Sequence, residues 1–173
     1  TQSGVFNVTF IASDGALADS EVVAITVNNV NQAPVLAAIG PKNVNEGVLL
    51  SFNSSGSDVD GTTPTMTALN VPVGANFVDN TNGTGTFTWT PNFTQSGVFN
   101  VTFIASDGTL ADSEVVAITV NNVNQAPVLA TIGPKSVNEG VLLNFNTSAS
   151  DADGAIPSMT AVNLPLGARY VNN

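Results

Sequence analysis

TQSGVFNVTFIASDG, the first 15 residues of the chain, occurs a second time, letter for letter, at residues 94–108. The match extends beyond this stretch, because residues 1–80 and 94–173 are identical at 64 of 80 positions. The chain of 173 residues therefore repeats with a period of 93 residues. Solenoid repeats span about 20–50 residues, whereas this period has the length of one small domain. We interpret the chain as a window on a tandem array of such domains.

Apolar and polar residues alternate within the repeat. Phe99, Val101 and Phe103 share one side of an extended segment, with Asn100 and Thr102 on the other. Alternation with a period of two, rich in Val, Phe and Thr, is typical of half-buried strands. Gly, Asn, Asp and Pro separate seven such segments. These segments predict strands at Pro34–Ile39, Val48–Ser54, Pro64–Val71, Ala75–Asp79, Thr84–Thr90, Val98–Ser106 and Ser113–Asn121.

Seven short strands in one repeat predict an all-β fold of tandem immunoglobulin-like (Ig-like) Greek-key sandwiches. The sequence NNVNQAP marks the seam between repeats, at Asn28–Pro34 and again at Asn121–Pro127. Proline opens a strand or lies at a sheet edge, so it marks a domain start. We therefore predict one complete and two partial repeats. Residues 1–31 would be the last two strands of one repeat, residues 32–124 a complete repeat, and residues 125–173 the first four strands of a third.

The composition excludes several classes of function. There are 13 acidic and 3 basic residues, which give a net charge of −10, so nucleic acid is not an expected partner. No run of 18 apolar residues is present, so we expect no membrane insertion in this segment. The chain has no His and no Cys, which removes disulfides, zinc sites and an imidazole base. Because every acid lies in a turn sequence, we expect no enzymatic activity.

Five segments resemble the cadherin-like and dystroglycan-type cadherin-like repeats of prokaryotic extracellular surface proteins, which are related to Ig-like repeats. These segments are NQAPVL at 31–36, VNEG at 44–47, SDVDG at 57–61, TGTFTWTP at 84–91 and GVFNVTFIASDG at 97–108. The resemblance implies an extracellular or cell-surface location. It also implies repeats that form stalks, with calcium bound between domains to stiffen them.

Loop positions in a Greek-key sandwich agree with that implication. Successive loops alternate between the two ends, so the loops of Asp58, Asp60 and Asp107 should meet where the repeat begins. Glu46 should lie at the opposite end, near the next repeat. Carboxylate and carbonyl oxygens at such a joint suit a calcium ion. We expect one joint to use Asn29, Asn31, Asp58, Asp60 and Asp107, and the other to use Glu46, Asn122, Asn124, Asp151 and Asp153.

The acids also have plainer interpretations. The linker carries Asn where cadherin-type linkers are rich in Asp, so we expect weak calcium binding, at about 10⁻⁴–10⁻³ M. Asp-x-Asp-Gly and Ser-Asp-Gly also favour ordinary turns, which need no ion. For Asp112 and Glu114, with their copies Asp19 and Glu21, the sequence favours a solvated hairpin flank.

Three classes of function remain open. The first, which the sequence favours, is a structural module of an extracellular stalk or filament. The second is a carbohydrate- or ice-binding adhesin module, whose partner would be surface glycans. The third is an accessory domain of a sugar-active enzyme. An exposed aromatic platform would favour the second class, and a catalytic domain elsewhere in the gene would favour the third.

The two partial repeats need partners. A lone two-strand hairpin is marginally stable, and four strands without their neighbours expose an apolar face. We expect residues 1–31 to contact the equivalent of residues 125–173 in a neighbouring repeat. That neighbour would be part of a longer array or a second copy joined head to tail.

Overall fold

The computed structural model describes residues 2–172, and within that range it contains strands and no helix. No helix capable of crossing a membrane therefore occurs among these residues. The all-β prediction is confirmed. The strands are β1 (Gly4–Ser13), β2 (Ala18–Val27), β3 (Val35–Leu36), β4 (Lys42–Asn45), β5 (Leu50–Ser57), β6 (Thr65–Leu69), β7 (Asn76–Asp79), β8 (Thr84–Trp89), β9 (Gly97–Ser106), β10 (Ala111–Asn121), β11 (Val128–Leu129) and β12 (Ala149–Ser150).

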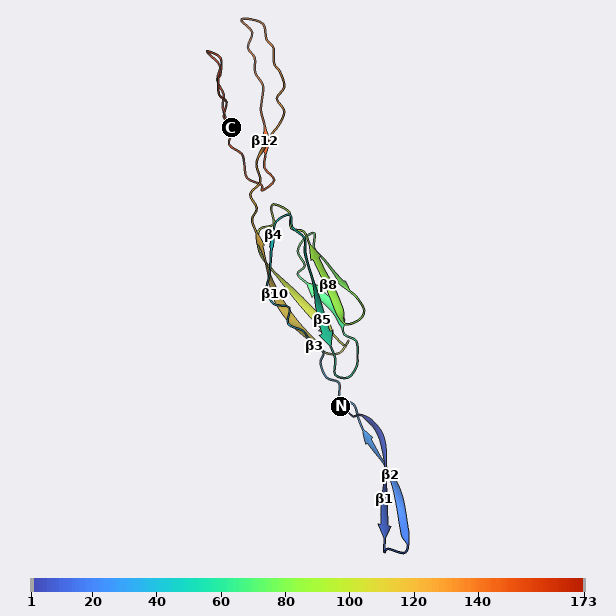
Figure 1. Cartoon of the computed structure of the whole chain (residues 1–173). Helices are drawn as coiled ribbons and strands as arrows, with labels where there is room; N and C mark the ends of the chain where they lie inside the picture. Colours follow the sequence, from blue (N-terminus) through green and yellow to red (C-terminus); the bar gives the residue numbers. More distant parts are fainter. Residues whose placement is uncertain (1, 173) are drawn as a thin grey trace.

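Residues 32–124, which we call the central repeat, form a sandwich of two four-stranded sheets (Figure 1). One sheet has the order β4–β10–β9–β6 and the other the order β3–β5–β8–β7. Neighbouring strands are antiparallel except β4 and β10, which run parallel. Side chains from both sheets meet in one core. This is the Greek-key arrangement of an Ig-like domain.

The first predicted strand, Pro34–Ile39, is wrong in one respect. After β3 the chain leaves the β3–β5–β8–β7 sheet and joins the β4–β10–β9–β6 sheet as β4, a strand that the sequence did not predict. Gly40, with φ of 66°, and Pro41 make the crossing. The Glu114 carboxylate fixes it by accepting hydrogen bonds from the amides of Ile39 (2.7 Å) and Gly40 (2.9 Å). The other six predicted strands are present, with ends shifted by at most three residues.

Aromatic side chains fill the core of the central repeat. Trp89 is 1% exposed and lies in the core. Phe103 is fully buried and meets Phe52 and Phe77 edge-on, with ring centroids 5.7 and 5.4 Å apart. Gly85 leaves room for the Phe77 ring, since a Cβ at Gly85 would lie 2.2 Å from it. Close packing of this kind tolerates neither a larger residue at Gly85 nor a cavity at Phe103.

The same ten-residue strand occurs in two different surroundings. GVFNVTFIAS forms both β1 and β9, and ADSEVVAITV forms both β2 and the first ten residues of β10. In the central repeat Phe103 and Ile118 are fully buried, but their counterparts Phe10 and Ile25 are 57% and 44% exposed. The hairpin β1–β2 thus keeps its internal pairing without a core to cover its apolar face.

Residues 125–172 contain fewer strands than the four predicted there. Only β11 and β12 form, and they pair with each other as β3 and β5 do in the central repeat. The counterparts of β4, β6 and β7 are not strands, because their partners in the central repeat are β10, β9 and β8. Counterparts of those three partners would follow residue 173. The strands that form are therefore those with a partner in this chain.

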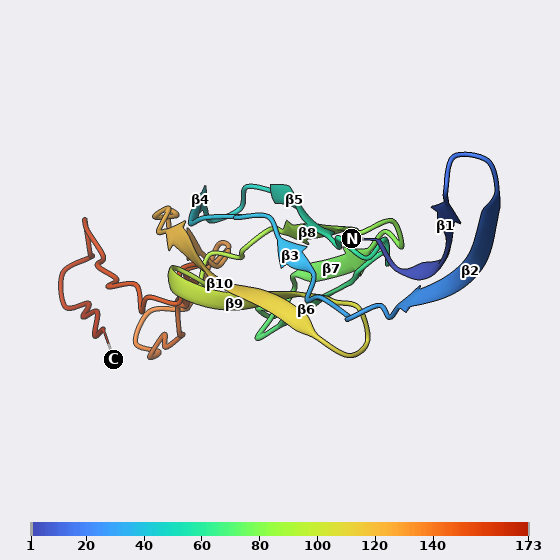
Figure 2. The same cartoon turned by 90° about the horizontal axis from the view of Figure 1, so that it is seen from below.

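The two partial repeats lie at opposite ends of the central repeat (Figures 1 and 2). The hairpin β1–β2 projects beyond the end that carries β3. Residues 125–172 follow β10 at the other end. The predicted contact of residues 1–31 concerns a neighbouring repeat, and a single chain leaves that prediction open.

Two substitutions at matched positions should distinguish the effect of burial on stability from the effect of local sequence. We expect Phe103→Ala to destabilise the central repeat by about 3–5 kcal/mol, because it leaves a cavity in a close-packed core. Phe10→Ala, in the identical local sequence, should change stability by less than about 0.5 kcal/mol in dilute solution. Urea unfolding followed by the fluorescence of Trp89, the single Trp, measures both. Equal destabilisation by the two variants would contradict the structure.

Candidate functional site

Carboxylates of two loops bind the linker where the central repeat begins. The loop between β5 and β6 presents Asp60, whose Oδ2 accepts a hydrogen bond from the Gln32 amide (2.6 Å). The turn between β9 and β10 presents Asp107, whose Oδ2 accepts a bond from Nδ2 of Asn31 (2.8 Å). The structure therefore brings Asp60 and Asp107 to the linker, at the end of the repeat that the sequence predicted.

Local turn chemistry places these acids. Oδ1 of Asp58 accepts a bond from the Asp60 amide (2.7 Å), and Gly61, with φ of 86°, closes the turn. Oδ1 of Asp107 accepts bonds from the amides of Thr109 and Leu110, both at 2.7 Å. The Leu110 bond, followed by the Thr109 and Asn31 bonds, holds the pKa of Asp107 below its ordinary value of 3.8. These bonds favour the charged carboxylate.

Glu46 occupies the other end of the central repeat, as predicted. Its amide donates to the carbonyl oxygen of Asn121 (3.1 Å), and its Oε2 accepts a bond from the Val123 amide (2.9 Å). The side chain is 2% exposed. A buried carboxylate is costly unless hydrogen bonds or a cation compensate it. Glu46 thus ties β4 to the start of the second linker.

The second linker is also bound from its far side. Oδ2 of Asp153 accepts a bond from the Gln125 amide (2.6 Å), and Oδ1 of Asp151 accepts one from the Asp153 amide (2.8 Å). These contacts reproduce those of Asp60 and Asp58 one period earlier. The Asp-x-Asp-Gly sequence therefore binds the preceding linker in both repeats.

Several carboxylate oxygens at the joints have no hydrogen-bond partner although they are buried. Each belongs to a carboxylate whose other oxygen accepts a main-chain amide. Buried oxygens of this kind leave a negative charge that a cation could neutralise. They are Glu46 Oε1, Asp58 Oδ2, Asp60 Oδ1 and Asp153 Oδ1.

The asparagines contribute less than the sequence predicted. Asn31 donates to Asp107, and Nδ2 of Asn124 donates to the carbonyl oxygen of Gln125 (3.2 Å). Asn29 and Asn122 are exposed. Among residues 2–172, no group of three or more acidic side chains is close enough together to hold a metal ion. The carboxylates at a joint thus share a linker without forming one ligand shell.

Each joint in this chain carries three of the four acids that a joint between complete repeats would have. The first joint has Asp58, Asp60 and Asp107, and the second has Glu46, Asp151 and Asp153. By the period of 93 residues, the fourth acid would be a counterpart of Glu46 at the first joint and a counterpart of Asp107 at the second, and both positions fall outside residues 1–173.

The structure corrects the solvated interpretation of Asp112 and Glu114. Oδ2 of Asp112 accepts a bond from the Leu36 amide (2.8 Å), and Glu114 binds the crossing between β3 and β4. These acids fasten the first strand to β10 across 74–76 residues of sequence. Their position on the inward face of β10, four and two residues before Val116, was the available signal.

Comparisons with known proteins agree with this architecture. The family model described as "Putative Ig domain" matches residues 33–121, which is nearly the whole central repeat. Chitinase A of Pseudoalteromonas piscicida is 28% identical over 156 residues, which cover 88% of this chain and 19% of the chitinase. This chain thus spans about a fifth of the length of that curated relative.

Two solved structures align with part of this chain. An endo-fucoidan hydrolase from glycoside hydrolase family 107 aligns with a TM-score of 0.48 and 22% identity, over 70% of this chain and 19% of that one. The SrpA adhesin from Streptococcus sanguinis aligns with a TM-score of 0.45 and 12% identity, over 54% of this chain and 58% of that one.

The turn at Asp107 should respond to acid. Because the folded-state pKa is lowered, the carboxylate bonds stabilise the turn above pH 3.8 and are lost as the pH falls through the lowered pKa. We expect the amide resonances of Thr109 and Leu110 to titrate together, with a midpoint below 3.8. NMR spectra across this pH range measure the midpoint. Asp107→Asn should abolish the transition, and a midpoint above 3.8 would contradict the geometry.

Proposed function

The chain belongs to the Putative Ig domain family, whose model matches residues 33–121, and on this premise we propose that it is a non-catalytic spacer of a longer extracellular protein. Its repeats would hold a sugar-active catalytic domain at a fixed distance from another part of the same protein. The observation that carries the proposal is the similarity to Chitinase A, which extends over 88% of this chain but only 19% of the chitinase. A similarity confined to so small a part of the enzyme supports an accessory role for the segment.

The carboxylates support a structural role. All seven acids of residues 32–124 accept a hydrogen bond from a main-chain amide. A general acid or nucleophile of a glycosidase must instead face the glycosidic bond. The bonded pairs are Glu46 with Val123, Asp58 with Asp60, Asp60 with Gln32, Asp79 with Thr81, Asp107 with Leu110, Asp112 with Leu36 and Glu114 with Ile39.

The aromatic side chains favour a spacer over a sugar-binding adhesin module. Sugar rings stack on exposed aromatic faces, yet every aromatic residue of residues 32–124 is buried or half-buried. The stalk or filament module that the sequence favours needs the same physical property as an enzyme spacer, which is resistance to bending. The similarity to a chitinase supports the accessory role over the stalk or filament module.

We also propose that calcium binds weakly at the joints and stiffens them. The buried carboxylate oxygens without a partner, Glu46 Oε1 and Asp153 Oδ1, support this proposal because they belong to consecutive repeats. Linker carbonyl and amide oxygens would complete a shell of six to eight ligands. The resemblance to cadherin-like repeats points the same way. Bridging two repeats through one ion would restrict the linker between them.

A hydrolysis assay tests the non-catalytic proposal. We expect the purified chain to release no reducing sugar from colloidal chitin or chito-oligosaccharides, because the acids of residues 32–124 are engaged by the backbone. A full-length chitinase serves as the positive control. Release that rises with chain concentration and disappears after Asp60→Asn would contradict the proposal.

A thermal-stability measurement tests the cation proposal. With a dissociation constant of about 1 mM, about 10 mM calcium should stabilise the chain by about 1.4 kcal/mol. Glu46→Gln should remove most of this gain, because Gln keeps the shape but loses the charge. Asp79→Asn, at an acid of the β7–β8 turn outside both joints, is the matched control and should keep the gain. An absence of stabilisation in the unmodified chain would refute calcium binding.

A further inference from the structure

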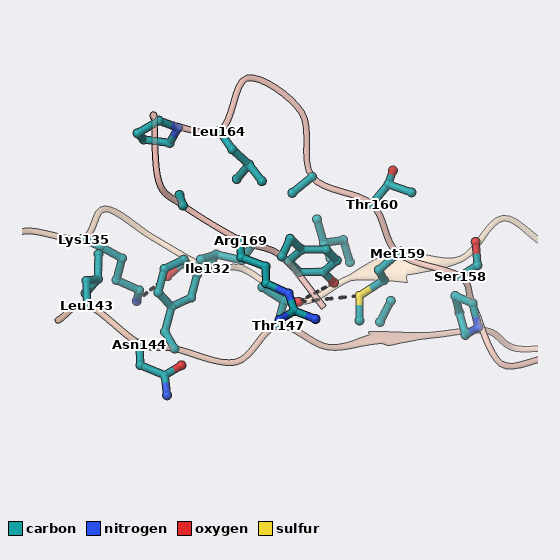
Figure 3. A pocket seen from close by; sticks show the side chains of 18 of the residues that line it. Ile132, Lys135, Leu143, Asn144, Thr147, Ser158, Met159, Thr160, Leu164 and Arg169 are labelled. Carbon is teal, nitrogen blue, oxygen red and sulfur yellow. Dashed lines mark hydrogen bonds between the residues drawn. The ribbon is translucent and has the colours of Figure 1, made fainter. Parts of the chain in front are cut away.

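The hollow within residues 127–170 does not indicate a ligand site (Figure 3). It measures about 970 Å³. Its lining includes Leu129, Phe145, Met159 and Tyr170. Their counterparts one period earlier belong to the core of the central repeat or pack against it, and are Leu36, Phe52, Met66 and Phe77. Counterparts of β8, β9 and β10 would fill the hollow in a complete repeat.

The turn between β7 and β8 contains a chemically reactive pair of residues. Asn82–Gly83 is the one Asn-Gly pair in residues 1–173, and Asn82 is exposed to water. Glycine has no side chain to hinder its backbone nitrogen, so this nitrogen can approach the preceding side-chain amide closely. We propose that Asn82 is a site of spontaneous deamidation, promoted by the conformation of this turn. The turn lies inside the central repeat, so the proposal depends on neither the joints nor a catalytic domain.

The reaction consumes water and releases ammonia. The Gly83 nitrogen loses its proton to hydroxide and bonds to Cγ of Asn82, which places a negative charge on Oδ1. The Cγ–Nδ2 bond then breaks, and the nitrogen takes a proton from water and leaves as ammonia. The product is a five-membered succinimide. Water opens this ring at either of its two carbonyl carbons, so position 82 becomes an aspartate or an isoaspartate.

Two donors of Thr84 already bind the oxygen on which the charge forms. Oδ1 of Asn82 accepts a hydrogen bond from the Thr84 amide (3.1 Å) and another from Oγ1 of Thr84 (2.6 Å). A hydrogen bond strengthens when its acceptor becomes charged. Donors that are already in place therefore lower the barrier, as those of an oxyanion hole do in acyl transfer. Thr84 should thus accelerate the attack on Asn82.

The backbone of the turn leaves the attacking nitrogen available. Within residues 2–172, the amide of Gly83 donates no hydrogen bond. The Gly83 carbonyl oxygen accepts a bond from the Gly56 amide (2.8 Å), and that of Thr84 accepts one from the Asn80 amide (2.9 Å). These bonds hold Gly83 and Thr84 in one arrangement beside the Asn82 side chain, and reacting groups held in this way combine faster.

The fold itself requires the glycine that makes Asn82 reactive. Gly83 has φ of 78°, a conformation that favours glycine. A Cβ at Gly83 would also lie 3.0 Å from the carbonyl oxygen of Gly56. A larger residue would slow deamidation, but it would strain the turn. The reactive pair is therefore a consequence of how β7 and β8 are joined.

Asn92 has the same oxygen contacts without the glycine. Its Oδ1 accepts bonds from the Thr94 amide (3.0 Å) and from Oγ1 of Thr94 (2.8 Å). The residue after Asn92 is Phe93, whose ring lies against Gly47. The bulk of this side chain hinders attack by the Phe93 nitrogen. Asn92 is therefore a matched control within the same chain.

An isoaspartate at position 82 would loosen an edge of the central repeat. It would add one carbon to the backbone of the turn, whose closing bond joins Asn80 to Thr84. Strand β7 is the edge of its sheet and pairs with β8 alone. It carries Phe77, which packs edge-on against Phe103 in the core. Deamidation would therefore make the stability of the repeat decline as the protein ages.

Peptide mapping by mass spectrometry tests the proposal on the full chain. The chain should be made in a host that adds no N-glycans, because Asn82 and Asn92 both lie in Asn-x-Thr sequences. It is then kept folded in a mildly alkaline buffer. We expect Asn82 to lose its amide at least about tenfold faster than Asn92, which is a barrier lower by about 1.4 kcal/mol. Isomerisation at Asp-Gly pairs changes no mass and does not interfere. An Asn82 amide that persists as long as that of Asn92 would overturn the proposal.

A substitution at Thr84 tests the role of the turn. Thr84→Val removes the hydroxyl but keeps the amide donor and the branched shape. It should slow the loss of the Asn82 amide by about two- to tenfold, the contribution of one net hydrogen bond. Thr88→Val, on the same strand away from the turn, should leave the rate unchanged, and Trp89 fluorescence verifies that both variants are folded. In urea, where the turn is lost, Thr84→Val should have no effect. Equal rates for Thr84→Val and the unmodified folded chain, or equal slowing in urea, would overturn the proposed promotion.

Discussion

The structure depends on the pairing of each strand's backbone with a neighbouring strand. GVFNVTFIAS forms a strand twice because its hairpin partner follows it closely in both copies. VLLSFNSSGS at residues 48–57 contains a strand of eight residues, but its counterpart at 141–150 keeps only two strand residues. The difference is the partner β8, which pairs with β5 and whose counterpart would fall outside residues 1–173. Backbone amides and carbonyls that have no partner strand form hydrogen bonds with water instead.

Backbone amides of the linkers also need hydrogen-bond partners, and at the joints side-chain carboxylates take the place of a partner strand. Linker amides at Gln32, Val123 and Gln125 each donate to a carboxylate of an adjoining repeat. The second linker is held from both sides, by Glu46 and by Asp153, which restricts its freedom. The carboxylate oxygens that remain without a partner are the basis for the cation site that we propose at these joints.

Most strands of the central repeat could be predicted from sequence, because each strand shows its own alternation of apolar and polar residues. Loop alternation in a Greek key placed Asp60 and Glu46 at opposite ends, which the structure confirms. The split between β3 and β4 could not be read locally, since it depends on Glu114, which lies 74 residues beyond Gly40. The same separation hid the role of Asp112. The unformed strands after residue 125 depend on counterparts of β8, β9 and β10, which would fall outside residues 1–173.

Residue-resolved hydrogen exchange in dilute solution tests most directly the claim that partners, rather than sequence, decide where the fold is stable. NMR distinguishes the amides of Val8, Phe10 and Ile25 from those of Val101, Phe103 and Ile118, although the surrounding sequences are identical. The account predicts that the second set exchanges only on global unfolding of the central repeat. The first set should exchange orders of magnitude faster, through local opening. Equal protection of the two sets in dilute solution would contradict the account.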